Sequence, residues 1–315
     1  MNNNDLVSVI MSTYNEELKW IEESINSILN QSYSNIELII ILDNPQNVKL
    51  KHLLRDYAKS DNRICLIVNN ENIGLVKSLN IALKHCKGKY IARMDADDIS
   101  SIGRLNSQKE YLENNNLDFV YSGVTFMNEE GLNLFETNKY KIEPNRVKKL
   151  LKITNISYHP TWFLKKEIYE TLNGYREIFY CEDYDFSLRC ISKGFRIGKM
   201  DQNVLRYRVR KNSISRSYSL EQYLNSRGIL KLYKQRKLED IMLINKMMDK
   251  SKNEASKKEN EKYINADRKF NGAITLLKNQ LILKGIIEVI KVLFTNRYIG
   301  YKLIDLLKYK IKSYI

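Results

Sequence analysis

The sequence predicts an α/β fold, with a mostly parallel sheet covered by helices on both faces and a helical C-terminal extension. Short apolar runs alternate with segments of helical periodicity over the first hundred residues. These runs are apolar throughout, as expected for strands that are buried on both faces of a parallel sheet. The chain has 315 residues, of which 43% are hydrophobic, so it can bury a core of the required size.

Four strand–helix units open the chain. The expected strands are the apolar runs at 6–11, 36–42, 63–68 and 90–94. Helical spacing of Leu18, Ile21 and Ile25 predicts the first helix, with Asn15 as its N-cap. Further helices are expected around 52–58 and after the turn at 72–74.

After Asp98 the pattern is less regular. We expect helices at 104–114, 147–153, 165–172 and 182–193, a strand pair around Gly123 within 118–126, a short edge or bent strand at 159–163, and a strand at 204–209. We assign residues 1–217 to an α/β domain and residues 218–315 to a basic helical extension.

Three polar clusters each follow a predicted strand, at 13–16, at Asp43 and at 95–98. Parallel strands bring such clusters to one edge of the sheet, where ligands bind. The carboxylates of Asp95, Asp97 and Asp98 repel one another unless a cation neutralises them, which favours a divalent metal holding a diphosphate. The alternative is a solvated acidic turn in which Asp98 caps a helix. No glycine-rich phosphate loop is present, which argues against a dinucleotide cofactor.

The positive charge is concentrated in the last third of the chain. The net charge is +15, but residues 1–205 carry 26 Lys and Arg against 27 Asp and Glu, whereas residues 206–315 carry 26 against 10. Basic amphipathic helices are expected from residue 276 onward, and these can lie on an anionic membrane surface. The alternative is packing on the α/β domain or in a homodimer. No nucleic-acid motif occurs, so nucleic acid is not an expected partner.

Neither a signal peptide nor a membrane span is visible, and we expect a cytoplasmic protein. The four cysteines lack C-x-x-C spacing, which predicts reduced, mostly buried thiols rather than a zinc or redox site.

Four segments together resemble the family 2 glycosyltransferases with the GT-A fold. They are SVIMSTYNE, the DADD after a strand, HPTWFLKKEIYETLNGYRE, and CEDYDFSLRCISKGF followed by YRVRKNSISR. The chain is most similar to bacterial enzymes that assemble O-antigen, capsule or exopolysaccharide. The resemblance implies inverting transfer from a nucleotide-diphosphate sugar, with Mn²⁺ or Mg²⁺ as cofactor. The implied donor is UDP-glucose or UDP-galactose, and the acceptor is a polyprenyl-linked saccharide at the inner face of the plasma membrane.

The resemblance also implies a role for individual residues. Asp97 would be the direct metal ligand, with Asp95 shared between metal and ribose and Asp98 in support. Asp183 would be the catalytic base, although the Glu182–Asp183 pair can also be read as a charged helix start. The list of implied nucleoside contacts is Thr13, Tyr14, Glu16 and Asp43.

Two departures from the family pattern matter. Asn44-Pro45-Gln46 stands where many relatives have Asp-Gly-Ser, and Arg210 stands where relatives often have histidine. Because arginine can bind a diphosphate through two N–H groups, we expect a basic cluster over the diphosphate. Its members are Arg208, Arg210, Lys211 and Arg216. The alternative is a solvated basic loop.

Three aromatic residues have two interpretations each. Trp162 and Tyr184 could stack on a sugar, but buried aromatics are the commoner case. We expect His159 to be a core or hydrogen-bonded residue. The alternative is that it contacts the acceptor. Other functions are also open: an N-acetylhexosaminyltransferase, a non-catalytic nucleotide-sugar or membrane-surface binding protein on the same fold, or a nucleotidyltransferase, although the last usually has a glycine-rich loop after the first strand.

Overall fold

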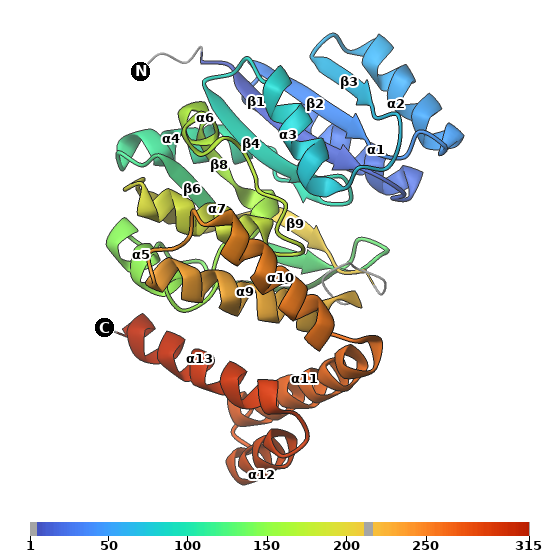
Figure 1. The fold of residues 1–315 in the computed structure, drawn as a ribbon. Coiled ribbons are helices and arrows are strands. Elements are labelled where there is room, and N and C mark those ends of the chain that lie inside the picture. The colour runs from blue at the N-terminus through green and yellow to red at the C-terminus, as the bar shows by residue number, and fades with distance from the viewer. Residues whose placement is uncertain (1–4, 211–216, 315) are drawn as a thin grey trace. The chain divides into compact units, whose positions relative to one another are not determined.

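A nine-stranded mixed sheet forms the first of two structural units in the computed structural model (Figure 1). The structure describes residues 5–210 and 217–314. The first unit consists of Met1–Lys148, Ile156–Glu177 and Arg189–Arg210, and the second of Lys149–Asn155, Ile178–Leu188 and Lys211–Ile315.

The first half of the sheet is parallel, as predicted. Its strands are β1 (Val7–Thr13), β2 (Ile36–Leu42), β3 (Ile64–Val68) and β4 (Tyr90–Asp95), arranged in the order β3-β2-β1-β4. The register pairs Thr13 with Leu42 and Ser12 with Asp95. The strands therefore end level with one another, and the polar residues that follow them share one edge.

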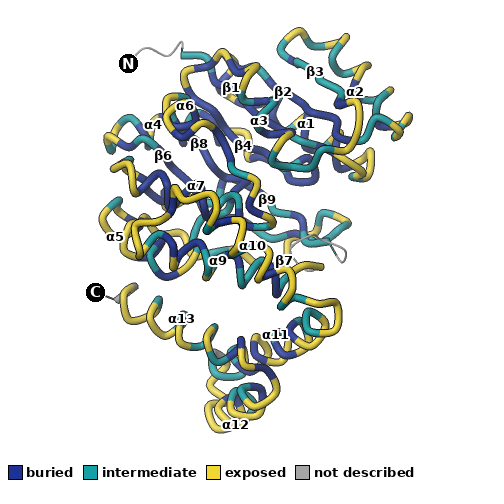
Figure 2. The backbone as a smooth tube through the Cα atoms, viewed as in Figure 1, coloured by how far each residue is buried: buried dark blue, intermediate teal, exposed yellow. Residues whose placement is uncertain are grey.

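Helices α1 (Leu18–Leu29), α2 (Val48–Ser60), α3 (Leu75–His85) and α4 (Arg104–Asn114) connect or flank these strands. β1, β2 and β4 are almost entirely buried (Figure 2), in agreement with their continuous apolar sequences, whereas β3, at the end of the strand order, is mostly half-buried. One core cluster combines residues of β1 and β2 with Ile21, Ile25 and Leu50 from the helices. The predicted N-cap was wrong: α1 begins after Glu17, and the Asn15 side chain instead accepts hydrogen bonds from Asn44 and Asn47.

The second half of the sheet is mixed. Its strands are β8 (Phe163–Lys165), β6 (Phe119–Met127), β9 (Ile197–Arg208) and β5 (Ile99–Ser100), with β7 (Asn133–Glu136) added on β6. The predicted strand pair around Gly123 was wrong, because β6 is one strand with an irregular register at that glycine. A side chain at Gly123 would overlap Thr137 and Asn203, so glycine lets these elements approach.

The predicted strand at 159–163 was also wrong. His159–Thr161 form a 3₁₀ turn, η1, because Pro160 suits the first turn of a helix and lacks the N–H that a strand would use. The following β8 lies between β4 and β6 rather than at an edge. Three further helices are α5 (Pro144–Leu151), α6 (Lys166–Leu172) and α7 (Glu182–Ser192).

The second unit contains the C-terminal helices. They are α9 (Ser219–Lys234), α10 (Ile241–Glu254), α11 (Lys257–Lys278), α12 (Ile282–Leu293) and α13 (Arg297–Tyr314). Their core includes Tyr263, Phe270, Val292 and Ile299. Much of α12 and α13 is nevertheless exposed (Figure 2). Across the described chain, no helix has the length and apolarity needed to span a bilayer. All four cysteines are free thiols.

Candidate active site

Three carboxylates gather where β4 ends. One oxygen from each of Asp95, Asp97 and Asp98 lies within 4.8 Å of the others. Asp97 and Asp98 are buried, and Asp98 Oδ2 has no hydrogen-bond partner within the described part of the chain. A solvated turn does not account for two buried carboxylates. Clustered, partly unsatisfied carboxylate oxygens are instead the donor set that Mg²⁺ or Mn²⁺ prefers.

Burial and mutual repulsion dominate the electrostatics of this cluster. Burial, followed by the charge of Asp95, raises the pKa of Asp97 to about 7, although the Arg210 guanidinium acts in the opposite direction. Burial and the charge of Asp97 raise the pKa of Asp98 well above its usual range. The cluster therefore lacks enough compensating positive charge from the protein alone, as expected where a cation completes a site.

Two arginines pair with the cluster from different sides. Arg210 Nε lies 2.8 Å from Asp97 Oδ2, and its Nη1 lies 3.9 Å from Glu16 Oε1. The buried Arg93 forms an ion pair with Asp95. Arg210 is thus close to the oxygens that could hold a metal, and its side chain is 30% exposed. Of the other members of the predicted basic cluster, Lys211 and Arg216 lie outside the described residues.

Arg208 does not fit the predicted contact with a diphosphate. Its side chain is 1% exposed, and its Nη2 donates to Glu23 Oε2 at 2.6 Å. Its Nε and Nη1 donate to the backbone oxygens of Asp97 and Glu129, both at 2.8 Å. Its backbone N–H also donates to Asp98 Oδ1 at 2.8 Å. Arg208 therefore supports the carboxylate cluster from within the protein.

The loop after β1 is organised by Glu16. Its Oε2 accepts hydrogen bonds from Thr13 Oγ1 at 2.7 Å and from the backbone N–H of Tyr14 at 2.8 Å. Tyr14 itself is 43% exposed, so its ring is available to a ligand. The same loop contacts Arg210 through Glu16, which joins the predicted nucleoside residues to the acidic cluster.

Asp43 has a structural role that the sequence did not predict. Its carboxylate is buried and accepts hydrogen bonds from Asn69 Nδ2 at 2.7 Å and from the backbone N–H groups of Ile73 and Gly74 at 2.9 and 2.8 Å. It therefore fixes the loop that leads into α3. This arrangement leaves little of the Asp43 carboxylate for the predicted contact with uracil or ribose.

Asp183 lies in the second unit, in the first turn of α7. Its Oδ2 accepts a hydrogen bond from Asn155 Nδ2 at 2.8 Å, and its Oδ1 accepts one from the Tyr184 backbone N–H at 2.6 Å. The start of a helix stabilises a negative charge, so the position favours an ionised carboxylate. Sequence analysis did not identify Asn155, which has no motif around it.

The aromatic residues are structural. Trp162 and Tyr184 are buried, and the Tyr184 hydroxyl donates to the Leu151 carbonyl at 2.5 Å. Neither can therefore stack on a sugar without rearrangement. His159 is a hydrogen-bonded core residue, with Nε2 2.8 Å from the Tyr175 hydroxyl. Burial, with a smaller effect of Arg93, lowers the pKa of His159 well below its usual range.

Sequence analysis also missed Arg93, Glu23 and Arg104 as supports of the site. Arg104 is fully buried, and its Nη2 donates to the Arg93 carbonyl at 2.8 Å. A signal for Arg93 was present, because a charged residue within a buried apolar strand needs a partner. No comparable signal marks Glu23, one of several acidic residues in the first helix segment.

Comparison with known proteins places this site in a family. The model of glycosyl transferase family 2 matches residues 8–172. An uncharacterised glycosyltransferase of Methanocaldococcus jannaschii is 39% identical over 216 residues, covering 67% of this chain and 74% of the relative. The O-antigen biosynthesis glycosyltransferase WbnJ of Escherichia coli is 36% identical over 236 residues, covering 71% of this chain and 91% of the relative.

Solved structures share the fold at low sequence identity. Staphylococcus aureus TarS in complex with UDP-GlcNAc has a TM-score of 0.57 and 19% identity, covering 72% of this chain and 66% of TarS. The mannosyltransferase PcManGT from Pyrobaculum calidifontis, in complex with GDP-Man and Mn²⁺, has a TM-score of 0.57 and 17% identity, covering 91% and 86%. The chain belongs to glycosyl transferase family 2 and is a glycosyltransferase with the GT-A fold.

Proposed function

We propose that this glycosyltransferase moves a hexose, with inversion, from a nucleotide-diphosphate sugar to a polyprenyl-diphosphate-linked saccharide in the synthesis of a bacterial surface polysaccharide. The observation that carries the donor half of this proposal is the cluster of Asp95, Asp97 and Asp98 at the carboxyl edge of the sheet. Hard oxygen ligands of this kind suit a divalent cation that also binds a diphosphate. UDP-GlcNAc bound to TarS, and GDP-Man with Mn²⁺ bound to PcManGT, are consistent with such a donor.

The proposed roles at the donor end follow from the contacts. Asp97 and Asp95 would hold Mn²⁺ or Mg²⁺, which as a Lewis acid supplies compensation for the charge on the leaving diphosphate. Thr13, Tyr14 and Glu16 would line the nucleoside pocket. Arg210, already beside Asp97, would turn its guanidinium to the diphosphate and stabilise its negative charge.

Asp183 is the proposed general base. Inversion needs one carboxylate that accepts the proton of the acceptor hydroxyl as this hydroxyl attacks the anomeric carbon. No covalent intermediate is required, because the nucleotide-linked sugar is already activated. The hydrogen bond from Asn155 fixes the orientation of the Asp183 carboxylate, which favours a defined direction of proton transfer.

The proposed acceptor follows from a relative, and the proposed location follows from the C-terminal helices. WbnJ is named for O-antigen biosynthesis, which favours a lipid-linked saccharide acceptor for this chain as well. The basic C-terminal third and the exposed apolar residues of α12 and α13 favour peripheral association with the inner face of the plasma membrane.

A donor panel tests the function. Purified protein is incubated with UDP-glucose, UDP-galactose, UDP-GlcNAc or GDP-mannose, a polyprenyl-diphosphate-sugar acceptor mimic, and either MnCl₂ or EDTA. We expect UDP release and product formation with a UDP-hexose and Mn²⁺, loss of both with EDTA, and an inverted anomeric configuration in the product by NMR. Preference for UDP-GlcNAc would favour the N-acetylhexosaminyltransferase alternative. Nucleotide-sugar binding without turnover of any donor would favour the non-catalytic alternative.

A further inference from the structure

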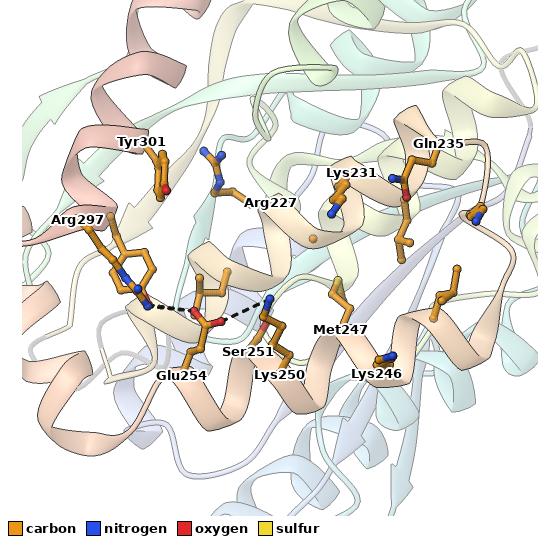
Figure 3. A pocket seen from close by; sticks show the side chains of 16 residues that line it. Arg227, Lys231, Gln235, Lys246, Met247, Lys250, Ser251, Glu254, Arg297 and Tyr301 are labelled. Atoms are coloured by element: carbon orange, nitrogen blue, oxygen red, sulfur yellow. Dashed lines mark hydrogen bonds and ion pairs between the residues drawn. The ribbon is translucent and has the colours of Figure 1, made fainter.

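A pocket of about 540 Å³ lies within the second unit, between α9, α10 and the start of α13 (Figure 3). Its lining is strongly basic. One acidic residue, Glu254, is set against six basic residues in the lining: Arg227, Lys231, Lys237, Lys246, Lys250 and Arg297. The pocket is therefore suited to an anion.

Much of this positive charge is uncompensated. Glu254 lies 3.5 Å from Arg297 and 3.8 Å from Lys250, and both ion pairs are drawn in Figure 3. Asp305 pairs with Arg227 at 2.7 Å. None of the ion pairs within the described residues involves the other three basic residues, which are Lys231, Lys237 and Lys246. All three are exposed, so an anionic ligand could approach them and supply a counter-charge.

Part of the lining of the pocket is apolar, which a site for a free anion does not require. Leu224, Leu232, Leu243 and Met247 line it together with the glycine at position 228. A Cβ at Gly228 would overlap the Met247 side chain, so the glycine allows α9 and α10 to approach closely. The pocket thus combines cationic groups with an apolar surface, a combination that suits an amphiphile.

An exposed apolar stripe continues from the pocket along α13. Tyr301 lines the pocket and is the first of four exposed side chains, followed by Ile304, Leu307 and Ile311. Their spacing of three, three and four positions places them on one face of the helix. A hydrocarbon chain attached to an anion in the pocket could contact this face and bury part of it.

We propose that this pocket binds the phosphate headgroup of a lipid whose hydrocarbon chains contact the exposed stripe of α13. This proposal adds a defined site to the peripheral membrane association proposed above, and it rests on that association. It does not rest on glycosyl transfer, because none of the pocket residues belongs to the donor site or is the proposed base.

Sedimentation with vesicles tests the pocket. The vesicles are phosphatidylcholine alone, or phosphatidylcholine with either phosphatidylglycerol or a polyprenyl phosphate. We expect Lys231→Gln/Lys246→Gln to lose at least about tenfold more affinity for phosphate-bearing vesicles than the control Lys258→Gln/Lys269→Gln, which removes two exposed α11 charges outside the pocket. Equal losses of vesicle affinity in the two double variants would contradict phosphate binding by the pocket. A preference between the two doped vesicles identifies the lipid.

A second pair of measurements tests the lipid itself. The double variant Ile304→Ser/Leu307→Ser should weaken vesicle binding several-fold. Because both side chains are exposed, α13 should stay folded in this variant. Unchanged vesicle binding would contradict a lipid as the ligand of the pocket. An affinity for inorganic diphosphate in solution as high as that for the vesicles would contradict it as well. Hydrolysis of the donor in solution should be unchanged in all three variants, so failure of this proposal is distinguishable from failure of the proposed function.

Discussion

Arg208 and Arg210 lie two positions apart near the end of β9, yet they have different environments. The Arg208 guanidinium is buried against Glu23, Asp97 and Glu129, whereas Arg210 remains 30% exposed beside the Asp97 carboxylate. The sequence shows two basic residues of equal standing. Only the register of β9 beside β6 and the position of α1 decide which of them can reach a ligand.

Arg208→Met is expected to destabilise the protein by about 3 kcal/mol, because it removes the buried guanidinium that pairs with the half-buried Glu23 and takes away the side-chain donor of the Asp97 backbone oxygen. Arg206→Met is the matched control on the same strand. Its guanidinium donates to the Asn133 side chain and to the Gly131 carbonyl, both on the exposed side of the strand and neither of them charged, so a loss of about 1 kcal/mol is expected. Urea unfolding of both variants measures the difference. Equal losses would show that Arg208 is not a buried support.

The buried His159 makes the stability of the fold depend on pH. Burial keeps this imidazole neutral and holds its pKa well below its usual range, whereas a histidine in the unfolded chain titrates at about pH 6.5. Below that pH the unfolded chain binds a proton that the native protein does not. The folded protein therefore loses stability as the pH falls through about 6.5.

We expect this one residue to reduce the free energy of unfolding by about 1.4 kcal/mol for each pH unit below about pH 6.5. His159→Gln should be less stable at neutral pH, because it disturbs the contact with Tyr175, but its stability should depend less on pH. The exposed His52→Gln is the control and should keep the wild-type slope. An identical slope in His159→Gln would contradict a neutral buried histidine.

At the scale of elements, prediction succeeded where periodicity was regular. The runs that became β1, β2 and β4 are buried on both faces, and that of β3 is half-buried, so their continuous apolar sequences identified them. β7 was missed because its four residues are exposed and carry no apolar pattern. The turn η1 was read as a strand because Trp162 and Phe163 extend its apolar character. Such short elements depend on tertiary contacts more than on local sequence.

Gly74 shows how one backbone position shapes the sheet edge. It adopts φ +85° and ψ 163° at the start of α3, and its N–H donates to Asp43 Oδ2. This region of backbone conformation is nearly restricted to glycine. Asp43 and Gly74 together hold the loop between β3 and α3.

Gly74→Ala is expected to cost about 1–3 kcal/mol of stability from backbone strain alone, since no atom lies within 4 Å of the added Cβ. Gly103→Ala is a close control. Gly103 also starts a helix with open space around it, but its φ is −94°. Its substitution should change stability by less than about 1 kcal/mol. Thermal unfolding compares the two, and a similar effect at both positions would rule out conformational strain at Gly74.

At the scale of the molecule, the sequence located the basic C-terminal third but not the composition of the second unit. That unit also includes Lys149–Asn155 and Ile178–Leu188. Within it, Asn225 Nδ2 donates to the Phe179 carbonyl at 2.9 Å. Such long-range contacts leave no local pattern, and so Asp183 and Asn155 could be paired only from the structure.

Membrane association should depend on the exposed apolar residues in α12 and just after its C-terminal end. Leu283 and Phe294 are 74% and 88% exposed, so Leu283→Ser/Phe294→Ser should lower vesicle partitioning about tenfold without unfolding the protein. The control is Leu132→Ser/Leu134→Ser in the first unit, at residues that are 67% and 54% exposed. Partitioning that falls equally in both would argue against a membrane-facing role of α12.

The central claim is that the carboxylate cluster binds the donor through metal while Asp183 acts on the acceptor. Calorimetric titration of UDP into wild type, Asp97→Ala and Asp183→Ala, each with and without MnCl₂, tests it most directly. We predict Mn²⁺-dependent UDP binding in wild type and Asp183→Ala, at least about tenfold weaker binding in Asp97→Ala, and no glycosyl transfer by either variant. Unchanged UDP affinity in Asp97→Ala, or an equal loss in both variants, would contradict the claim.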